Sequence, residues 1–464
     1  MTMTFPTEET IAAIATAIAA GQGGIAVIRI SGPKAFEVGK SIVSISKEKI
    51  WHSHTVLYGH VMDEQNKKQI DEVLVLPMKG PRSFTGEDIV EIHCHGGLIA
   101  VQHVLERILN QTEVRKAMPG EFSQRAVLNG RLDLTQAEAI SELIGARSRQ
   151  AAQLAMVGIN GELQRRINTL RDNLLDQLSE LESRVDFEDE LPPLNGDKVL
   201  TELCKVQSKL QKLIDDSKRS YFLRHGLKVA LIGCPNVGKS SVLNRLSRRE
   251  RAIVTDIPGT TRDLLESEII LEGVPITLLD TAGIRTTDDE IEKIGIAKTQ
   301  EALMTADVVV LVFDLSMGWT NNDHALLTKI PKDAPKLIVG NKADIQNDSK
   351  IKNHKQETQE IKPDVTFSAL TGKGEKALIQ SLLKQCGAHE TQGLEIVLND
   401  RHIELANMAI AALKRTKKAA EQKLPWDFWT IDLREAIHNL GEVTGNEITE
   451  ALLERIFSHF CIGK

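Results

Sequence analysis

A phosphate-binding loop signature restricts the fold of this chain more than any other feature. The run GCPNVGKS, residues 233–240, fits the pattern G-x-x-x-x-G-K-[ST] at every fixed position. It follows the apolar run 228–232 and continues into SVLNRL, which has helical character. Backbone N–H groups and the helix N-terminus surround phosphates when such a loop joins a strand to a helix. The motif predicts a nucleotide-binding α/β domain in which Lys239 reaches the β- and γ-phosphates and Ser240 holds Mg²⁺.

Strand-like runs alternate with helical segments after Gly226. This alternation indicates βαβ units and a doubly wound, mostly parallel sheet. The runs expected to form its strands are 228–233, 266–273, 275–280, 307–314, 335–342 and 365–370.

Further motifs follow in the order expected of a GTPase. DTAG begins at Asp280, at the end of an apolar run, where a magnesium-linked Asp and a Gly that senses the γ-phosphate belong. NKAD, 341–344, ends the strand KLIVG, and the carboxylate of Asp344 can accept two N–H bonds from guanine, which adenine cannot supply. Ser368 and Ala369 complete the base pocket. Together, these motifs predict GTP binding.

The segment between the first two motifs, 255–263, reads TDIPGTTRD and resembles a switch loop. We expect Thr261 to complete the Mg²⁺ shell there; the alternative is a polar surface loop of turn-forming residues. Ile284 stands where Ras-like enzymes have the Gln that orients the attacking water. Either hydrolysis is slow, or a carboxylate in the segment 288–292 takes over the role of that Gln. The residues predicted to bind GTP are Asn236, Val237, Gly238, Lys239, Ser240, Ser241, Thr255, Asp256, Ile257, Pro258, Gly259, Thr260, Thr261, Asp280, Thr281, Ala282, Gly283, Asn341, Lys342, Ala343, Asp344, Ser368, Ala369 and Leu370.

The chain on either side of this α/β region has a different texture. The N-terminal part is α+β, with strand-like runs at 23–31, 54–61, 70–77 and 88–95 and helical stretches near 33–45 and 97–110. An apolar stripe at helical spacing runs from Leu163 to Val185, and a second helix follows Pro192-Pro193. After about residue 385 the pattern is helical again, at 397–423, 428–440 and 446–459.

The simplest arrangement is a helical domain, divided in sequence, with the α/β domain inserted between its halves. Two separate helical domains are the alternative. The length of 464 residues, about three times the usual ~150 of one domain, suits either. The expected boundaries are 1–122, 123–222, 223–384 and 385–464.

Composition excludes some classes of protein. A net charge of −7 and an aromatic content of 4% argue against a chain that grips nucleic acid by charge or by stacking over its whole surface. Five separated cysteines form no disulfide framework or zinc pattern. The N-terminus lacks the basic segment of a signal peptide and no run is long enough to span a membrane, so we expect a cytoplasmic protein.

At this point the sequence resembles the tRNA-modification GTPase family known as MnmE or TrmE. The blocks that carry the resemblance extend over the whole chain. They are GGIAVIRISG, SFTGEDIVEIHCHGG, PGEFSQRAVLNGRLDLTQAEAI, GCPNVGKSS, TDIPGTTRD, DTAGIR, NKAD and the terminal FCIGK.

The resemblance implies a small α+β folate-binding and dimerising domain, a helical domain and an inserted P-loop G domain. It implies a homodimer that works with an FAD-containing flavoprotein, MnmG. Together they would add a carboxymethylaminomethyl-type group at C5 of the wobble uridine, position 34, of certain tRNAs. A GTPase of ribosome assembly, which shares the G-domain motifs, is the runner-up. A non-catalytic dimeric scaffold that uses GTP only as a switch is a third possibility.

The resemblance also implies K⁺-activated hydrolysis, with the two G domains meeting face to face. Asn236 would help to hold the K⁺, with backbone oxygens around Thr255, Ile257 and Thr260. The water-orienting carboxylate corresponds to Glu292, and Glu290, two residues earlier, is the alternative.

For 5,10-methylene- or 5-formyl-tetrahydrofolate, the resemblance points to Arg29, Glu91, Arg131 and the terminal Lys464. Without it, Arg29 and Glu91 read as an ordinary ion pair across a sheet. Cys461 would lie near the folate and the uridine in a catalytic role, and an inert thiol is the alternative.

One basic run is left outside these sites. Lys414, Arg415, Lys417, Lys418 and Lys423 fall on a predicted helix. The run is either a solvated helix face or a contact for tRNA phosphates.

Overall fold

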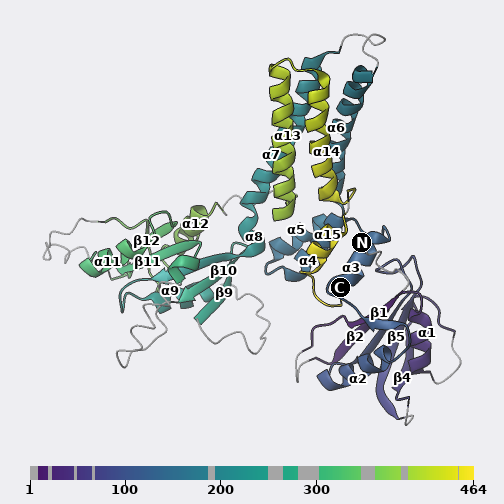
Figure 1. Cartoon of the computed structure of the whole chain (residues 1–464). Helices are drawn as coiled ribbons and strands as arrows, with labels where there is room; N and C mark the ends of the chain where they lie inside the picture. Colours follow the sequence, from purple (N-terminus) through teal and green to yellow (C-terminus); the bar gives the residue numbers. More distant parts are fainter. Residues whose placement is uncertain are drawn as a thin grey trace. The chain divides into compact units, whose positions relative to one another are not determined.

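The computed structural model in Figure 1 describes residues 9–18, 23–45, 50–64, 68–186, 194–248, 265–280, 302–345, 361–387, 396–447 and 449–463. They form two compact units. The first comprises 1–141, 158–206 and 404–464, and the second comprises 142–157 and 207–403. Among the described helices, none combines the length and apolar character that crossing a bilayer requires.

The N-terminal part of the first unit is a seven-stranded sheet in the order β3-β4-β5-β6-β2-β1-β7. Its strand pairs are antiparallel except for the parallel pair of β1 and β7. The elements are β1 (Thr10–Ile14), β2 (Ile25–Ser31), α1 (Ala35–Ile42), β3 (Val43–Ser44), β4 (Leu57–Met62), β5 (Gln69–Met78), β6 (Ile89–His95), α2 (Leu98–Leu109) and β7 (Val114–Lys116).

One face of this sheet packs against α1 and α2. Alternate residues of β2, namely Ala26, Ile28 and Ile30, enter that core, so Val27 and Arg29 point to the opposite face. The predicted strands are confirmed as β2, β4, β5 and β6. The sequence did not reveal β1, because its alanine-rich run TIAAI lacks the polar and apolar alternation that marks a half-buried strand.

The first unit continues in helices. Helix α6 carries the predicted apolar stripe, which is buried from Leu163 to Leu181. Helices α6 and α14 pack along one another, and Gly196 at the start of α7 lies against Trp426 and Trp429 of α14. The helices wholly in this unit are α3 (Glu121–Leu128), α6 (Glu162–Asp186), α14 (Trp426–Thr444) and α15 (Glu450–Phe457). The chain divides between the two units within α4 (Leu134–Gly145), α7 (Gly196–Arg219) and α13 (Asp400–Glu421), and most of α5 (Arg149–Ile159) belongs to the second unit.

The second unit is built on a six-stranded sheet in the order β13-β12-β11-β8-β10-β9. Only β9 is antiparallel to its neighbour, so the predicted mostly parallel sheet is confirmed. Its elements are α8 (Tyr221–His225), β8 (Leu227–Ile232), α9 (Lys239–Ser247), β9 (Leu265–Leu271), β10 (Val274–Asp280), β11 (Val308–Asp314), α11 (Asn321–Lys329), β12 (Lys336–Asn341), β13 (Val365–Thr366) and α12 (Glu375–Gln385).

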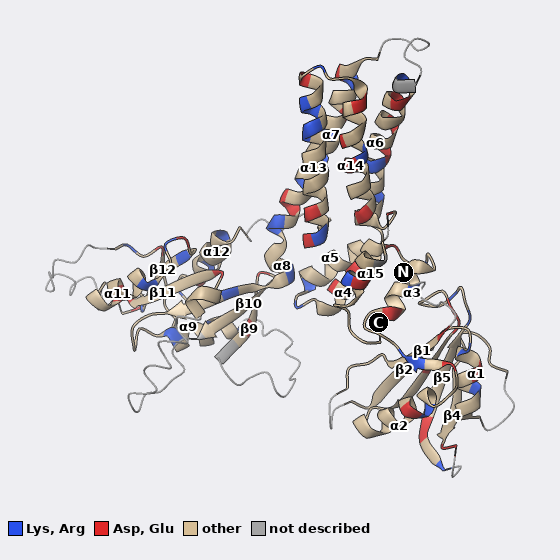
Figure 2. Ribbon diagram, in the orientation of Figure 1, with Lys and Arg blue, Asp and Glu red and all other residues tan. Residues whose placement is uncertain are grey.

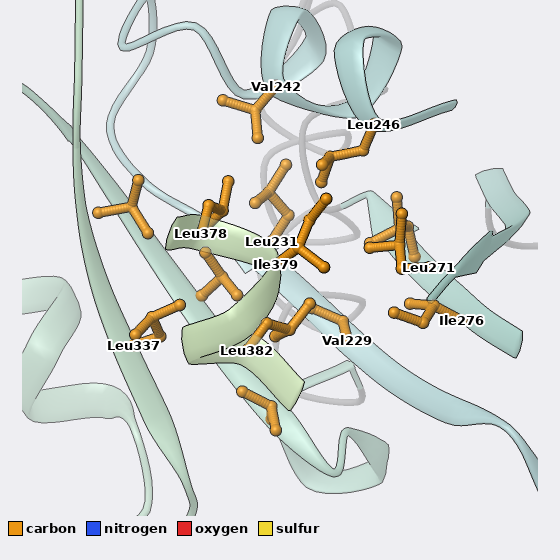
Figure 3. Close-up of a cluster of buried hydrophobic side chains, with 14 of the residues drawn as sticks. Val229, Leu231, Val242, Leu246, Leu271, Ile276, Leu337, Leu378, Ile379 and Leu382 are labelled. Carbon is orange, nitrogen blue, oxygen red and sulfur yellow. The ribbon is translucent and has the colours of Figure 1, made fainter. Parts of the chain in front are cut away.

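Both faces of this sheet are buried, which explains the continuous apolar character of its strands. Val229 and Leu231 of β8 face the core under α9 and α12, shown in Figure 3. Ala230 and Ile232 face a second core that includes residues of α11. The parallel strands therefore direct their carboxyl ends, where the nucleotide motifs stand, to one edge.

Candidate functional site

The phosphate-binding loop joins β8 to α9, as the motif predicted. Gly233 and Gly238 have φ angles of 156° and 95°. A Cβ atom on Gly233 would meet the carbonyl oxygen of Val312, and one on Gly238 would meet Nδ2 of Asn341. Asn236 is exposed at the tip of the loop with a φ of 64°, a left-handed conformation that Asn tolerates better than most residues. The close packing behind the loop therefore leaves no room for a side chain at either glycine.

Helix α9 begins directly after Gly238. Lys239 Nζ donates to the carbonyl oxygens of Gly233, at 2.7 Å, and Cys234, at 2.8 Å, which holds the ammonium over the loop. Ser240 and Ser241 follow in the first turn and are exposed. The first-turn N–H groups have no helical acceptor, so they attract anions. The loop therefore presents a cation, two hydroxyls and backbone donors to a phosphate group.

Asn341, at the end of β12, connects the phosphate loop to the predicted base pocket. Its side chain is buried; Nδ2 donates to the carbonyl oxygen of Val237 at 2.9 Å, and Oδ1 accepts from the backbone N–H of Ala369 at 3.0 Å. The two loops are far apart in sequence but share this one amide. The role of Asn341 in this structure is thus to brace the pocket.

Lys342 is held by a partner that the sequence motifs did not include. Its Nζ lies 2.6 Å from Oδ2 of Asp314, the last residue of β11. Burial opposes the ionisation of Asp314, but Lys342 and two hydrogen bonds from Ser316 outweigh it and hold the pKa of Asp314 below its ordinary value. The signal that could have revealed Asp314 is an acidic residue at the carboxyl end of an apolar strand.

The remaining residues of the predicted base pocket lie close together. The hydroxyl of Ser368 donates to Oδ1 of Asp344, and the N–H of Ala343 donates to the carbonyl oxygen of Phe367 at 3.1 Å. Leu370 is 81% exposed. The Asp344 carboxylate is therefore oriented by its neighbour and retains a second oxygen for a ligand.

Several predicted residues lie outside the part of the chain that the structure describes. They are Thr255, Asp256, Ile257, Pro258, Gly259, Thr260, Thr261, Thr281, Ala282, Gly283, Glu290, Glu292 and Lys464. Asp280 ends β10, and its side chain is likewise not described.

In the first unit, Arg29 and Glu91 stand opposite each other on β2 and β6. The guanidinium Nε lies 2.9 Å from Oε1 of Glu91, and both side chains are largely buried. The rings of Phe84 and Phe122 lie 5.1 and 5.6 Å from the guanidinium carbon. The ion pair therefore sits between two aromatic side chains.

The carboxylate of Glu91 has a second polar neighbour. Burial opposes its ionisation, but His93, whose Nε2 lies 3.7 Å from Oε2, and Arg29 hold the pKa of Glu91 below its usual value. His93 Nε2 is buried and has no hydrogen-bond partner among the residues described. The site thus combines a fixed carboxylate with a polar ring nitrogen that still has bonding capacity.

A buried ionic network links the loop of Phe84 to helix α3, which carries Phe122. Arg125 of α3 contacts Glu87 at 3.2 Å and Glu121 at 3.0 Å. Glu121 also forms an ion pair with Arg115 at 2.7 Å. The hydroxyl of Ser31 donates a hydrogen bond to Glu87 at 2.7 Å. Since Glu87 follows Phe84 and Glu121 precedes Phe122, Arg125 connects both sides of the aromatic pair.

The C-terminal tail packs on the same domain. The N–H of Gly120 donates to the carbonyl oxygen of Cys461 at 3.3 Å, and buried Gly463 lies against Ile14 at the end of β1. The Cys461 side chain is exposed. Arg131 is also exposed, in the turn between α3 and α4. Arg29 and Glu91 are thus in contact, whereas no contact joins either to Arg131 or Cys461 in the described part of the chain.

Family models and full-length relatives match this chain. The family described as "GTP-binding protein TrmE N-terminus" matches residues 10–131, and "MnmE helical domain" matches residues 134–461. A protein of Prochlorococcus marinus strain MIT 9303 named "tRNA modification GTPase MnmE" is 67% identical over 100% of both chains. One of the same name from Synechococcus sp. strain CC9902 is 61% identical over 99% of this chain and 100% of that one.

Solved structures match locally. The G domain of the T. maritima FeoB iron transporter is 27% identical over 34% of this chain and 98% of its own length, with a TM-score of 0.25. Era, in a complex with 16S ribosomal RNA, is 27% identical over 40% of this chain and 66% of its own, with a TM-score of 0.28. Scores this low carry no argument. The full-length matches do, and they show that this chain belongs to the MnmE family of tRNA modification GTPases and is a GTP hydrolase.

Proposed function

We propose that this GTPase takes part in adding a carboxymethylaminomethyl-type group at C5 of the wobble uridine of certain tRNAs. The observation that carries the proposal is the pairing of two sites in one chain. One is a phosphate loop braced by Asn341, and the other is the buried Arg29–Glu91 pair between aromatic rings. A ribosome-assembly GTPase would need the first site only, so the second site favours tRNA modification.

The residues at the second site fit a reduced folate. A pterin presents a donor–acceptor edge that the Glu91 carboxylate can pair with, and Nε2 of His93, which forms no hydrogen bond with the residues described, offers a further bond. The partly buried ring of Phe84 would exclude water from one face of the pterin, with the buried Phe122 packed behind it. Arg131 and Lys464 would bind the glutamate tail. The folate would supply the one-carbon unit, as 5,10-methylene- or 5-formyl-tetrahydrofolate.

At the phosphate loop, Ser240 and Thr261 would hold Mg²⁺. The exposed side chain of Asn236 fits a K⁺ site that would be completed by backbone oxygens of Thr255, Ile257 and Thr260. K⁺ would supply the positive charge beside the phosphates that an arginine finger supplies in other GTPases. Glu292 would orient the attacking water, with Glu290 as the alternative.

The protein would act in the cytoplasm as a homodimer with a flavoprotein partner that carries FAD, on a tRNA substrate. Potassium would favour contact between the two G domains. Cys461 would act on the uridine or the folate, since its exposed thiol stands on the tail that packs beside Gly120.

Mass spectrometry of wobble uridines in tRNA from cells lacking the gene tests the proposal. We expect the carboxymethylaminomethyl-type group to be absent and to return with the wild-type gene. A Cys461→Ser gene should leave GTP hydrolysis intact and fail to restore the modification if the thiol is catalytic. Normally modified wobble uridines in the deletion strain would refute the proposed function.

A further inference from the structure

The C-terminal half of α13 carries a set of lysines that neither proposed site uses. Lys414, Lys417 and Lys418 are spaced i, i+3, i+4, so they share one side of the helix, and all three are exposed. Lys423 follows just after the helix and is also exposed. Figure 2 shows this run of basic residues on α13. We refer to these four residues as the lysine face.

The lysine face is not neutralised within the described chain. The neighbouring Arg415 is paired with Asp432 at 2.6 Å and with Glu435, both on α14. Lys414, Lys417, Lys418 and Lys423 form no ion pair with the other residues described. Glu421 is the one carboxylate at the same helical spacing on this half of α13, so the face keeps a net positive charge in a chain whose total is −7.

An exposed aromatic ring lies beside the lysine face. The Arg415–Asp432 pair sets the register of the antiparallel helices α13 and α14, and the N–H of Leu424 donates to the carbonyl oxygen of Ala419 where the chain turns. Phe428 lies about one turn before Asp432 on α14. In this register it is therefore at the height of the C-terminal end of the lysine face. Its ring is 50% exposed, whereas the neighbouring Trp429 is buried.

We propose that the lysine face and Phe428 form a tRNA-binding surface, with the lysines on phosphates and the ring against an unstacked base. Lysine suits phosphates because its ammonium is a compact charge on a flexible stem, and it is depleted at protein–protein interfaces. A ring next to such charges is the arrangement used to bind single-stranded segments. The proposal rests on tRNA being the substrate and not on the wobble chemistry.

The test measures binding of an unmodified tRNA transcript to the full-length protein at several salt concentrations. The triple variant Lys414→Gln, Lys417→Gln, Lys418→Gln should bind at least about tenfold more weakly near ~0.1 M salt. Its slope of log affinity against log salt should fall by roughly 0.7–0.9 for each phosphate that the variant no longer neutralises. Phe428→Ala should weaken binding without changing that slope.

The matched control is Lys329→Gln, Lys332→Gln, Lys336→Gln, which removes the same charge from exposed positions of the α/β unit. It should bind the transcript like the wild type, and both triple variants should hydrolyse GTP normally. If both triple variants lost tRNA affinity equally, the change in net charge alone would explain the weaker binding, and the proposal would be overturned. Wild-type tRNA binding by the lysine-face variant would also overturn it, and loss of flavoprotein binding in that variant would then assign the surface to a protein.

Discussion

The side-chain amide of Asn341 donates to the backbone carbonyl of Val237, so the end of β12 holds the phosphate loop from behind. The oxygen of the same amide accepts a hydrogen bond from the backbone N–H of Ala369, which lies in the loop after β13. Asn341, at the end of β12, thus connects two loops that are distant in sequence. The geometry of the predicted nucleotide site therefore depends on a buried side-chain amide that bonds to the backbone of both loops.

Asn341→Ala should lower the free energy of unfolding by about 1–3 kcal/mol, because it leaves the carbonyl of Val237 and the N–H of Ala369 without partners. GTP should also bind more weakly, since both loops lose their common support. Urea unfolding and nucleotide titration measure the two effects. Asn322→Ala, at an exposed position of α11, should change neither. Equal stability of the two variants would contradict the bracing role.

Asp344→Asn should weaken GTP binding and relax the selection against xanthosine nucleotides. In the proposed base pocket the carboxylate would accept N–H bonds from the guanine edge, whereas an amide could donate to the oxygen that xanthine carries in place of the amino group. Competition between GTP and xanthosine triphosphate for the wild type and the variant measures the change. Unchanged base preference would count against the assignment of Asp344 to the base pocket.

Asn236→Ala should remove the stimulation of GTP hydrolysis by K⁺ over Na⁺ while leaving GTP affinity close to that of the wild type. The reason is that Asn236 is exposed at the loop tip, whereas the backbone donors and Lys239 remain in place. Hydrolysis rates in the two salts, together with nucleotide titration, test this. Equal K⁺ stimulation in wild type and variant would remove Asn236 from the cation site.

The Asp314–Lys342 pair should make stability depend on pH in the acid range. The pKa of Asp314 is lowered in the folded state, so its stabilising effect is complete above the unfolded-state pKa of about 3.9 and is lost as pH falls toward the lower folded-state value. The difference in unfolding free energy between wild type and Asp314→Asn should therefore shrink as pH falls below ~4. A difference that stays constant with pH would refute the coupling; Asp333→Asn, at an exposed position, is the control.

Arg125→Ala should destabilise the N-terminal domain by about 3–5 kcal/mol, because it leaves Glu87 without its buried cationic partner. Native-state hydrogen exchange of β1 and α3 amides locates the effect. Arg434→Ala breaks an exposed pair with Glu182 and should cost no more than about 1 kcal/mol. Similar exchange rates in the two variants would show that the Arg125 network is not needed to hold the loop of Phe84 against α3.

The sequence determined what is encoded locally. Spacing alone identified the phosphate loop, because a strand, a glycine turn and a helix N-terminus are contiguous in 228–240. Continuous apolar runs revealed the parallel sheet, since both of its faces are buried. The apolar residues of α6 recur at helical spacing, and this periodicity revealed the helix. The strand β1 was not predicted, because its small alanine side chains leave no periodic signal.

Contacts between distant segments were decided only by the tertiary structure. The sequence left open whether Arg29 and Glu91 were paired, and the register of β2 and β6 places them opposite each other. Asp314 could not be assigned to Lys342, nor Arg125 to Glu87, because each partner comes from another element. Periodicity reports which face of an element is buried, but only the packing of elements determines which polar groups meet there.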